Sequence, residues 1–169
     1  YVLDDLYTCK FLVGAGGTSC PVYRSLFKPR FPRAAKRFVV TLEQEFPYSY
    51  QDSDCHLWFF QHRLPGYAWY VPKANGIVNI GLGGSAAKLK KKNDTLKRHW
   101  TLLIEKLDKM GLIKGHEFKP VGHSYYLRGK NHVLQRDNTF IIGDSIGLAT
   151  RDMGEGIGPA IQSGIRAAE

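Results

Sequence analysis

The sequence has few cysteines and no long hydrophobic run, and both shortages exclude classes of protein. Its three cysteines are an odd number and include no C-x-x-C pair, so neither a disulfide framework nor a zinc site is indicated. The six histidines show no metal-ligand spacing either. No apolar run approaches the roughly 18 residues that a membrane-spanning helix needs. We therefore expect reduced thiols, no bound metal and a cytoplasmic location.

Acidic residues are also in short supply, with 15 Asp and Glu against 24 Lys and Arg, which leaves a net charge of +9. This balance favours anionic partners, which include nucleic acid, a membrane surface and phosphate-bearing ligands. Six cations crowd into the run from Lys88 to Arg98. Such a run is most often a solvated face, and the alternative is a peripheral membrane contact. No nucleic-acid-binding motif accompanies it, so nucleic acid is not an expected partner.

A glycine-rich stretch over residues 140–169 carries the clearest functional pattern. The apolar run 140–142 predicts a buried strand, and Gly143 and Asp144 stand at its carboxyl end, where open α/β sheets bind ligands. A further glycine cluster precedes an expected helix that runs to the end of the chain and has small residues at every fourth position. The start of such a helix offers unpaired N–H groups to an anion.

The same stretch also matches the G-x-S-x-G elbow of α/β-hydrolases, with Ser145 as the nucleophile. In that fold the acid and then the histidine follow the serine. The last histidine here is His132, so the hydrolase interpretation fails on chain order unless the chain is truncated.

The segments Gly143-Asp144-Ser145-Ile146-Gly147 and Gly154-Glu155-Gly156-Ile157 together resemble the second flavin-binding motif of FAD-dependent oxidoreductases of the hydroxylase and geranylgeranyl reductase group. The resemblance implies that Asp144 and Gly143 bind the ribityl chain of FAD. It also implies that the start of the helix, with Gly154, Gly156 and Ile157, faces the flavin ring. Many members of the group have a proline in the loop, where this chain has Arg151.

A second glycine cluster, at residues 14–17, follows a hairpin expected over residues 1–13. It matches the dinucleotide fingerprint G-x-G-x-x-G weakly, because the third glycine is missing and a proline interrupts the expected helix. It resembles more closely the motif G-A-D-G-x-x-S-x-V-R of the same flavoprotein group, with Gly16 in place of the Asp. The resemblance implies that Gly14 and Gly17 contact FAD, and the missing carboxylate leaves NAD(P)H as electron donor open.

Residues 65–83 contain P-G-Y-A-W-Y-V-P, then eight residues, then G-L-G. This pattern looks like the P-x-Y-x-W-x-F-P…G-x-G signature of geranylgeranyl reductases. Tyr67 and Trp69 stand at alternate positions and therefore point to one face of an expected strand, as a flat apolar ligand requires. The resemblance implies a pocket for an isoprenoid substrate beside the flavin, with Tyr67, Trp69, Pro72 and Gly83 as its contacts.

The expected fold class is α+β, with part of an α/β FAD-binding lobe and an antiparallel β-sheet substrate lobe that includes a helix. Short strands with tight turns, among them a hairpin turn at Asn75-Gly76, predict the antiparallel sheet. Helical spacing of apolar residues predicts one helix over 96–107, with Asn93 or Asp94 as its cap. The expected boundaries are 1–31 for a partial FAD-binding lobe, 32–133 for the substrate lobe, and 134–169 for the last strand and helix of the FAD-binding lobe.

The resemblance implies a FAD-dependent oxidoreductase that reduces double bonds of an isoprenoid or other apolar substrate at the flavin. The N-terminal strand-glycine-helix unit that holds the FAD pyrophosphate in this group is not in the sequence. We therefore expect a piece of a longer protein that by itself binds FAD weakly or not at all and is inactive. No catalytic residue can be named. The alternatives are a related flavin monooxygenase or halogenase, and a non-enzymatic basic binding module.

Overall fold

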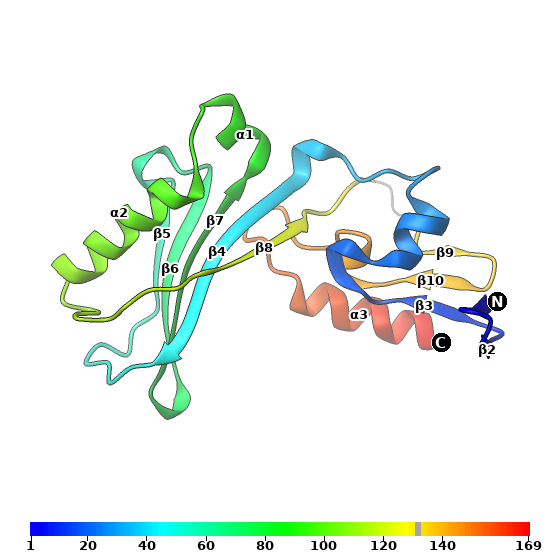
Figure 1. Ribbon diagram of the computed structural model, residues 1–169, viewed down its shortest axis with the longest axis horizontal. Helices are drawn as coiled ribbons and strands as arrows, with labels where there is room; N and C mark the ends of the chain where they lie inside the picture. Colours follow the sequence, from blue (N-terminus) through cyan, green and yellow to red (C-terminus); the bar gives the residue numbers. More distant parts are fainter. Residues whose placement is uncertain (131–132) are drawn as a thin grey trace. The chain divides into compact units, whose positions relative to one another are not determined.

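The computed structural model describes residues 1–130 and 133–169, and the chain divides into two compact units (Figure 1). Unit 1 comprises Tyr1–Phe38 and Tyr125–Glu169, and unit 2 comprises Val39–Ser124. His132, which the hydrolase interpretation used, lies outside the described residues.

The observed boundaries differ from those expected after residues 31 and 133 because both connecting segments pack within unit 1. The backbone N–H of Leu127 donates to the carbonyl of Arg37 at 3.0 Å. The rings of Phe38 and Tyr126 lie 4.8 Å apart, centroid to centroid. The basic run that resembled a linker in the sequence is therefore part of a folded unit.

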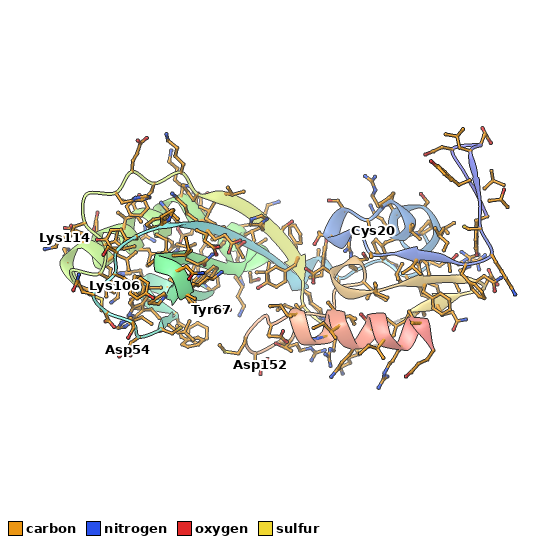
Figure 2. All side chains as sticks on the ribbon, turned by 90° about the horizontal axis from the view of Figure 1, so that it is seen from below. Cys20, Asp54, Tyr67, Lys106, Lys114 and Asp152 are labelled. Atoms are coloured by element: carbon orange, nitrogen blue, oxygen red, sulfur yellow. The ribbon has the colours of Figure 1, made fainter. Side chains whose placement is uncertain are left out.

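Unit 1 is built on a three-stranded sheet in the order β3 (Leu12–Gly14), β10 (Thr139–Ile141) and β9 (Gln135–Arg136). Strand β10 runs parallel to β3 and antiparallel to β9. Helix α3 (Ile157–Ala168) lies on one side of the sheet, and Figure 2 shows Cys20 on the other side, just before the helical turn η2 (Tyr23–Phe27). On that side Cys20, Tyr23 and Phe27 form a buried cluster with Ile141.

The strand expected at residues 140–142 and the helix after it are confirmed, but the N-terminal hairpin is shorter than expected. Strands β1 (Val2–Leu3) and β2 (Tyr7–Thr8) pair antiparallel, and the hairpin ends at Thr8. The strand expected to continue to Val13 is broken, because β3 pairs with β10, with Val13 opposite Phe140. Short 3₁₀ turns follow the two strands, η1 (Gly17–Ser19) after β3 and η6 (Gly143–Ser145) after β10.

Unit 2 contains the expected antiparallel sheet. The five strands lie in the order β5 (His56–Phe59), β6 (Gly66–Lys73), β7 (Ile77–Ser85), β4 (Phe38–Pro47) and β8 (Val121–Tyr126), with neighbours among the first four pairing antiparallel. The first residue of β4 and the last two of β8 belong to unit 1. The 3₁₀ turns η3 (Ala35–Arg37), η4 (Gln61–Arg63) and η5 (Ala74–Gly76) precede β4, β6 and β7. The last of them is the predicted hairpin turn.

Helix α2 (Leu96–Lys109) packs on one face of this sheet (Figure 1). Its buried residues, including Leu103 and Leu107, join the fully buried Tyr70 and Ile80 of the sheet in one core. The expected cap was wrong by one or two positions, because the hydroxyl of Thr95 accepts the N–H of Arg98 at the helix start. A short helix α1 (Ala86–Lys91) precedes α2. Within residues 1–130 and 133–169, none of the helices has the length and apolar character to cross a bilayer.

Candidate functional site

An open cleft of about 520 Å³ lies in unit 1, between the ends of β3 and β10 and the start of α3. Its lining comes from segments far apart in sequence: Ala15, Gly17, Tyr125, Ile142, Gly143, Asp144, Ala149, Gly154, Gly156, Ile157 and Ala160. Six of the seven residues predicted to contact a cofactor are in this set. The fold therefore brings together two motifs that stand more than 100 residues apart in the sequence.

Gly14 is the predicted contact that does not line the cleft. It lies at the buried end of β3, where an added Cβ would stand 2.9 Å from Cγ2 of Ile141 and 2.9 Å from Cβ of Val22. A glycine is needed at this position because β3 packs closely against β10 and against the segment that follows η1.

Three of the lining glycines, Gly17, Gly143 and Gly154, adopt left-handed backbone conformations that other residues rarely take, and an added Cβ would meet the wall of the cleft at the last two. Gly143 has a φ of +57° and an added Cβ would stand 3.2 Å from Cβ of Ala160, while its N–H donates to the hydroxyl of Ser163 at 3.0 Å. Gly154 has a φ of +68°, and its Cβ would stand 2.4 Å from the hydroxyl oxygen of Tyr125. Both positions require glycine, because a side chain would be strained and would also collide with the wall of the cleft.

The start of α3 forms one side of the cleft. Gly156 precedes the helix, and the carboxylate of Glu155 accepts the N–H of Gly158 at 2.8 Å. Pro159 occupies the first turn, where its missing N–H costs no helical hydrogen bond. The remaining early N–H groups and the positive end of the helix dipole favour an electronegative ligand edge here.

Asp144 supplies the only ionisable carboxyl among the residues that line the cleft. An added Cβ on Gly156 would stand 3.5 Å from its Oδ1, so this carboxyl lies directly opposite the start of α3. Burial raises the pKa of Asp144, and the nearby positive charge of Arg33 opposes that increase with a smaller effect. The group remains a hydrogen-bond acceptor that is costly to ionise without a ligand.

Arg33 organises the same region and was missed at the sequence level, where it stood in the basic run taken for a linker. Its guanidinium lies between two rings, 4.1 Å from the centroid of Tyr23 and 4.4 Å from that of Tyr126. It donates to the carbonyl oxygens of Thr18 at 2.6 Å and of Asp144 at 3.2 Å. Arg33 thus connects the turn after β3 with the turn after β10, and no local sequence signal distinguishes it from its basic neighbours.

The raised pKa of Asp144 makes a testable prediction about stability. Since the folded pKa is above the unfolded one, this carboxyl contributes stability when protonated, and that contribution is lost as the pH rises through the interval between the two pKa values. Asp144→Asn removes the ionised carboxylate, so we expect a higher Tm than the parent at pH 7. Below about pH 4 the difference should vanish, because the parent carboxyl is then protonated.

Asp152→Asn is the matched control for this prediction. The pKa of the exposed Asp152 is lowered, because the N–H of Met153 and the hydroxyl of Thr150 donate to its carboxylate. The same substitution should therefore leave the Tm unchanged or slightly lower at pH 7. Thermal unfolding followed by circular dichroism at pH 4 and pH 7 tests both variants, and a lower Tm for Asp144→Asn at pH 7 would contradict the account.

An aromatic face in unit 2 contains three of the four predicted substrate contacts. Tyr67 and Trp69 project from β6 with ring centroids 5.7 Å apart, and Gly83 of β7 lies opposite Tyr67 in the sheet register. Side chains alternate between the two faces of a strand, and Pro72 is an odd number of residues from both Tyr67 and Trp69 along β6. Pro72 therefore lies on the opposite face, where Tyr70 is fully buried.

Trp69 is held in a fixed position on that face. Its indole N–H donates to the side-chain oxygen of Asn79 at 2.6 Å. An added Cβ on Gly81 would stand 2.2 Å from Cζ2 of Trp69, so the indole lies over a strand that has no side chain at this point. Burial raises the pKa of Tyr67, which keeps its hydroxyl protonated at neutral pH. The face is thus apolar, flat and uncharged at its centre.

Two other chemistries find no support among the described residues. Ser145, the serine of the elbow-like match, is fully buried and is not presented as a nucleophile. In the part of the chain that the structure describes, no group of three His, Cys, Asp or Glu residues could hold a metal ion.

Comparison with known proteins agrees with the resemblance seen in the sequence. No family model matches the chain. The chain is 30% identical over 104 residues to the digeranylgeranylglycerophospholipid reductase of Thermoplasma volcanium, and the match covers 62% of this chain. The similarity is thus confined to a segment of this chain. The chain spans about a quarter of the reductase's length, since the match covers 26% of it.

Solved structures establish the fold to which the similar segment belongs. A geranylgeranyl bacteriochlorophyll reductase-like protein from Thermoplasma acidophilum matches with a TM-score of 0.75 at 23% identity, over 95% of this chain and 40% of that protein. The flavin-dependent halogenase CmlS matches with a TM-score of 0.62 at 18% identity, over 94% of this chain and 29% of the halogenase. The α+β fold expected from the sequence is confirmed, and it is shared with this reductase-like protein and with this halogenase.

Proposed function

We propose that this chain forms the part of a FAD-dependent oxidoreductase that contacts the ribityl chain and the ring of the flavin. The observation that carries the proposal is the convergence of Gly143, Asp144 and the start of α3 in one cleft. Similarity to a reductase and the fold shared with a flavin-dependent enzyme support the same conclusion.

The residues of the cleft fit a flavin in shape and chemistry. Four of its eleven lining residues are glycines, and three others are alanines, so a flat ring can approach the backbone closely. The carboxylate of Asp144 accepts hydrogen bonds from hydroxyl groups, which the ribityl chain offers. The N–H groups that begin α3 suit the electronegative edge of a flavin ring.

A bound flavin supplies the electron-transfer chemistry of such an enzyme. The residues of this chain orient the ring and exclude water from it. The apolar residues Ile142 and Ile157 contribute to that exclusion, because both line the cleft.

For the substrate we propose an isoprenoid or other apolar molecule whose double bond is reduced. The flat aromatic face of Tyr67 and Trp69 supports an apolar ligand, and the similar reductase is named for a geranylgeranyl lipid. A flavin monooxygenase or halogenase is the alternative, because a halogenase has the same fold. Analysis of the product formed with a geranylgeranyl substrate separates a saturated product from an oxygenated or halogenated one.

Titration with three flavins tests the cofactor proposal. Among the described residues that line the cleft there is no lysine or arginine, so we expect it to bind the ribityl chain and ring without a strong phosphate contact. Riboflavin, FMN and FAD should then bind weakly and with similar Kd, measured by quenching of flavin fluorescence. Asp144→Ala should weaken all three about tenfold, the value of one charge-assisted hydrogen bond.

Asp152→Ala is the control, since this exposed acid does not line the cleft. Equal losses in the two variants would indicate a general charge effect and count against the assignment. A Kd for FAD far below that for riboflavin would show that the adenine or phosphate part dominates binding, which is also contrary to the proposal.

A further inference from the structure

An exposed aromatic loop joins β5 to β6 in unit 2. Phe60 is 72% exposed, and Phe59 and Leu57 just before it are 43% and 40% exposed. Phe60 is in the loop, and Leu57 and Phe59 belong to the end of β5 that leads into it. Large apolar side chains exposed together in this way are unusual on a protein surface that faces only water.

The loop is held in a defined and strained shape. Phe60, His62 and Arg63 have φ values of 56°, 50° and 66°, a left-handed conformation that is rare outside glycine. Three such residues within four positions cost conformational energy, and strain of this kind concentrates where a loop has a function. The N–H of Phe60 donates to the carbonyl of Gly66 at 2.9 Å and the N–H of Leu64 donates to that of Gln61, so the tip is fixed by its own backbone.

A cluster of lysines lies beside this loop. The side-chain amine of Lys92 donates to the carbonyl of Arg63 at 3.2 Å, which joins the end of the lysine run to the loop. Lys88, Lys90 and Lys91 are exposed on α1, whose only buried residue is Leu89. Figure 1 shows α1 and the β5–β6 connection at the same end of unit 2.

Acids are scarce around the loop and α1, and the carboxylate of Asp94, just after the lysine run, contacts His99 and Arg98 at 2.8 and 3.5 Å. Between Asp54 and Asp94 there is no Asp or Glu. Among the described residues, no ion pair involves Arg63 or the four lysines at 88–92. This end of unit 2 therefore combines projecting aromatic rings with an uncompensated positive charge.

We propose that this loop and α1 form a docking surface for a bilayer that contains anionic lipids. Phe60 and Phe59 insert at the level of the headgroups, and Lys88, Lys90 and Lys91 contact the lipid phosphates. Projecting phenylalanines beside lysines favour a bilayer over a duplex nucleic acid, because a bilayer has an apolar layer directly beneath its anionic headgroups and the stacked bases of a duplex offer none. The proposal concerns unit 2 alone and does not depend on flavin binding.

Flotation of the 169-residue chain with vesicles tests the proposal. We expect binding to vesicles of phosphatidylcholine with 30% phosphatidylglycerol, little binding to phosphatidylcholine alone, and release as salt is raised. Each lysine near an anionic surface contributes about fivefold to partitioning, so replacing Lys88, Lys90 and Lys91 with Gln should lower the partition coefficient about 100-fold. Phe60→Ser should lower it about tenfold, and Phe60→Leu should retain most of it.

The matched control replaces Lys109, Lys114 and Lys119 with Gln, which removes the same charge elsewhere in unit 2. This variant should keep its partitioning within about threefold, because long-range charge effects are screened beyond the Debye length. Tryptophan fluorescence verifies that each variant is folded, since all three tryptophans lie in unit 2. Equal losses in the two triple variants, unchanged binding of Phe60→Ser, or equal binding to uncharged vesicles would each overturn the proposal.

Discussion

Gly66→Ala should destabilise unit 2 by about 3 kcal/mol, close to the upper limit for the insertion of one methyl group into a packed structure. An added Cβ at this position would stand 2.0 Å from the carbonyl oxygen of Gly83 and 2.8 Å from Cα of Gly84. Both atoms belong to the backbone of β7, so no side-chain rotation relieves the collision. The two strands would have to separate at the point where Gly66 pairs with Gly84.

Gly122→Ala is the control, because the substitution is the same and the site is also in a strand of unit 2. Its nearest neighbours would be 3.8 and 3.9 Å from the added Cβ, which is ordinary contact. We expect a change within about 0.5 kcal/mol. Urea unfolding followed by tryptophan fluorescence measures both variants. A loss of less than about 1 kcal/mol for Gly66→Ala would contradict the described contact between β6 and β7.

Arg33→Ala should destabilise unit 1 by about 3 kcal/mol, because it removes two cation–π contacts and several charge-assisted hydrogen bonds at a half-buried site. The guanidinium lies between Tyr23 and Tyr126 and donates to the carbonyls of Thr18 and Asp144. Without it the turns on both sides of the cleft lose their common support. Flavin affinity should fall as well, since Asp144 itself lies on one of these turns.

Two further variants separate charge from geometry at this position. Arg33→Lys retains the charge but cannot stack as a plane or reach both turns, so it should recover less than half of the stability. Arg30→Ala removes an exposed arginine of the same segment and should change little. Unit 1 has no tryptophan, so amide hydrogen exchange in η6 and α3 is the suitable measurement. Unchanged exchange in Arg33→Ala would contradict the supporting role of this residue.

The parts of the site that are continuous in sequence could be predicted from it. An apolar run, Gly143-Asp144 and a glycine cluster before a helix indicate a strand, a turn and a helix start, each set by neighbours within a few positions. In the same way, the alternation of Tyr67 and Trp69 places both on one face of a strand.

Long-range partners could not be predicted from the sequence. The parallel pairing of β3 with β10 joins residues more than 120 positions apart, and it explains why the N-terminal strand breaks. Arg33 has no local feature that separates it from the other basic residues nearby. Its contribution to stability depends on its contact with the ring of Tyr126 and on hydrogen bonds to carbonyls beyond residue 140. The strain at Phe60 to Arg63 also appears only in the backbone conformation.

The most direct test of the central claim is to map, residue by residue, where a flavin binds on the chain. Amide chemical shifts of the ¹⁵N-labelled chain, recorded during titration with riboflavin, respond even to weak binding. The account predicts saturable shifts at Gly143, Asp144, Gly154, Gly156 and Ile157, with small changes elsewhere in unit 1. The absence of shifts at these positions, or shifts centred on another surface, would contradict the assignment of the cleft as a flavin site.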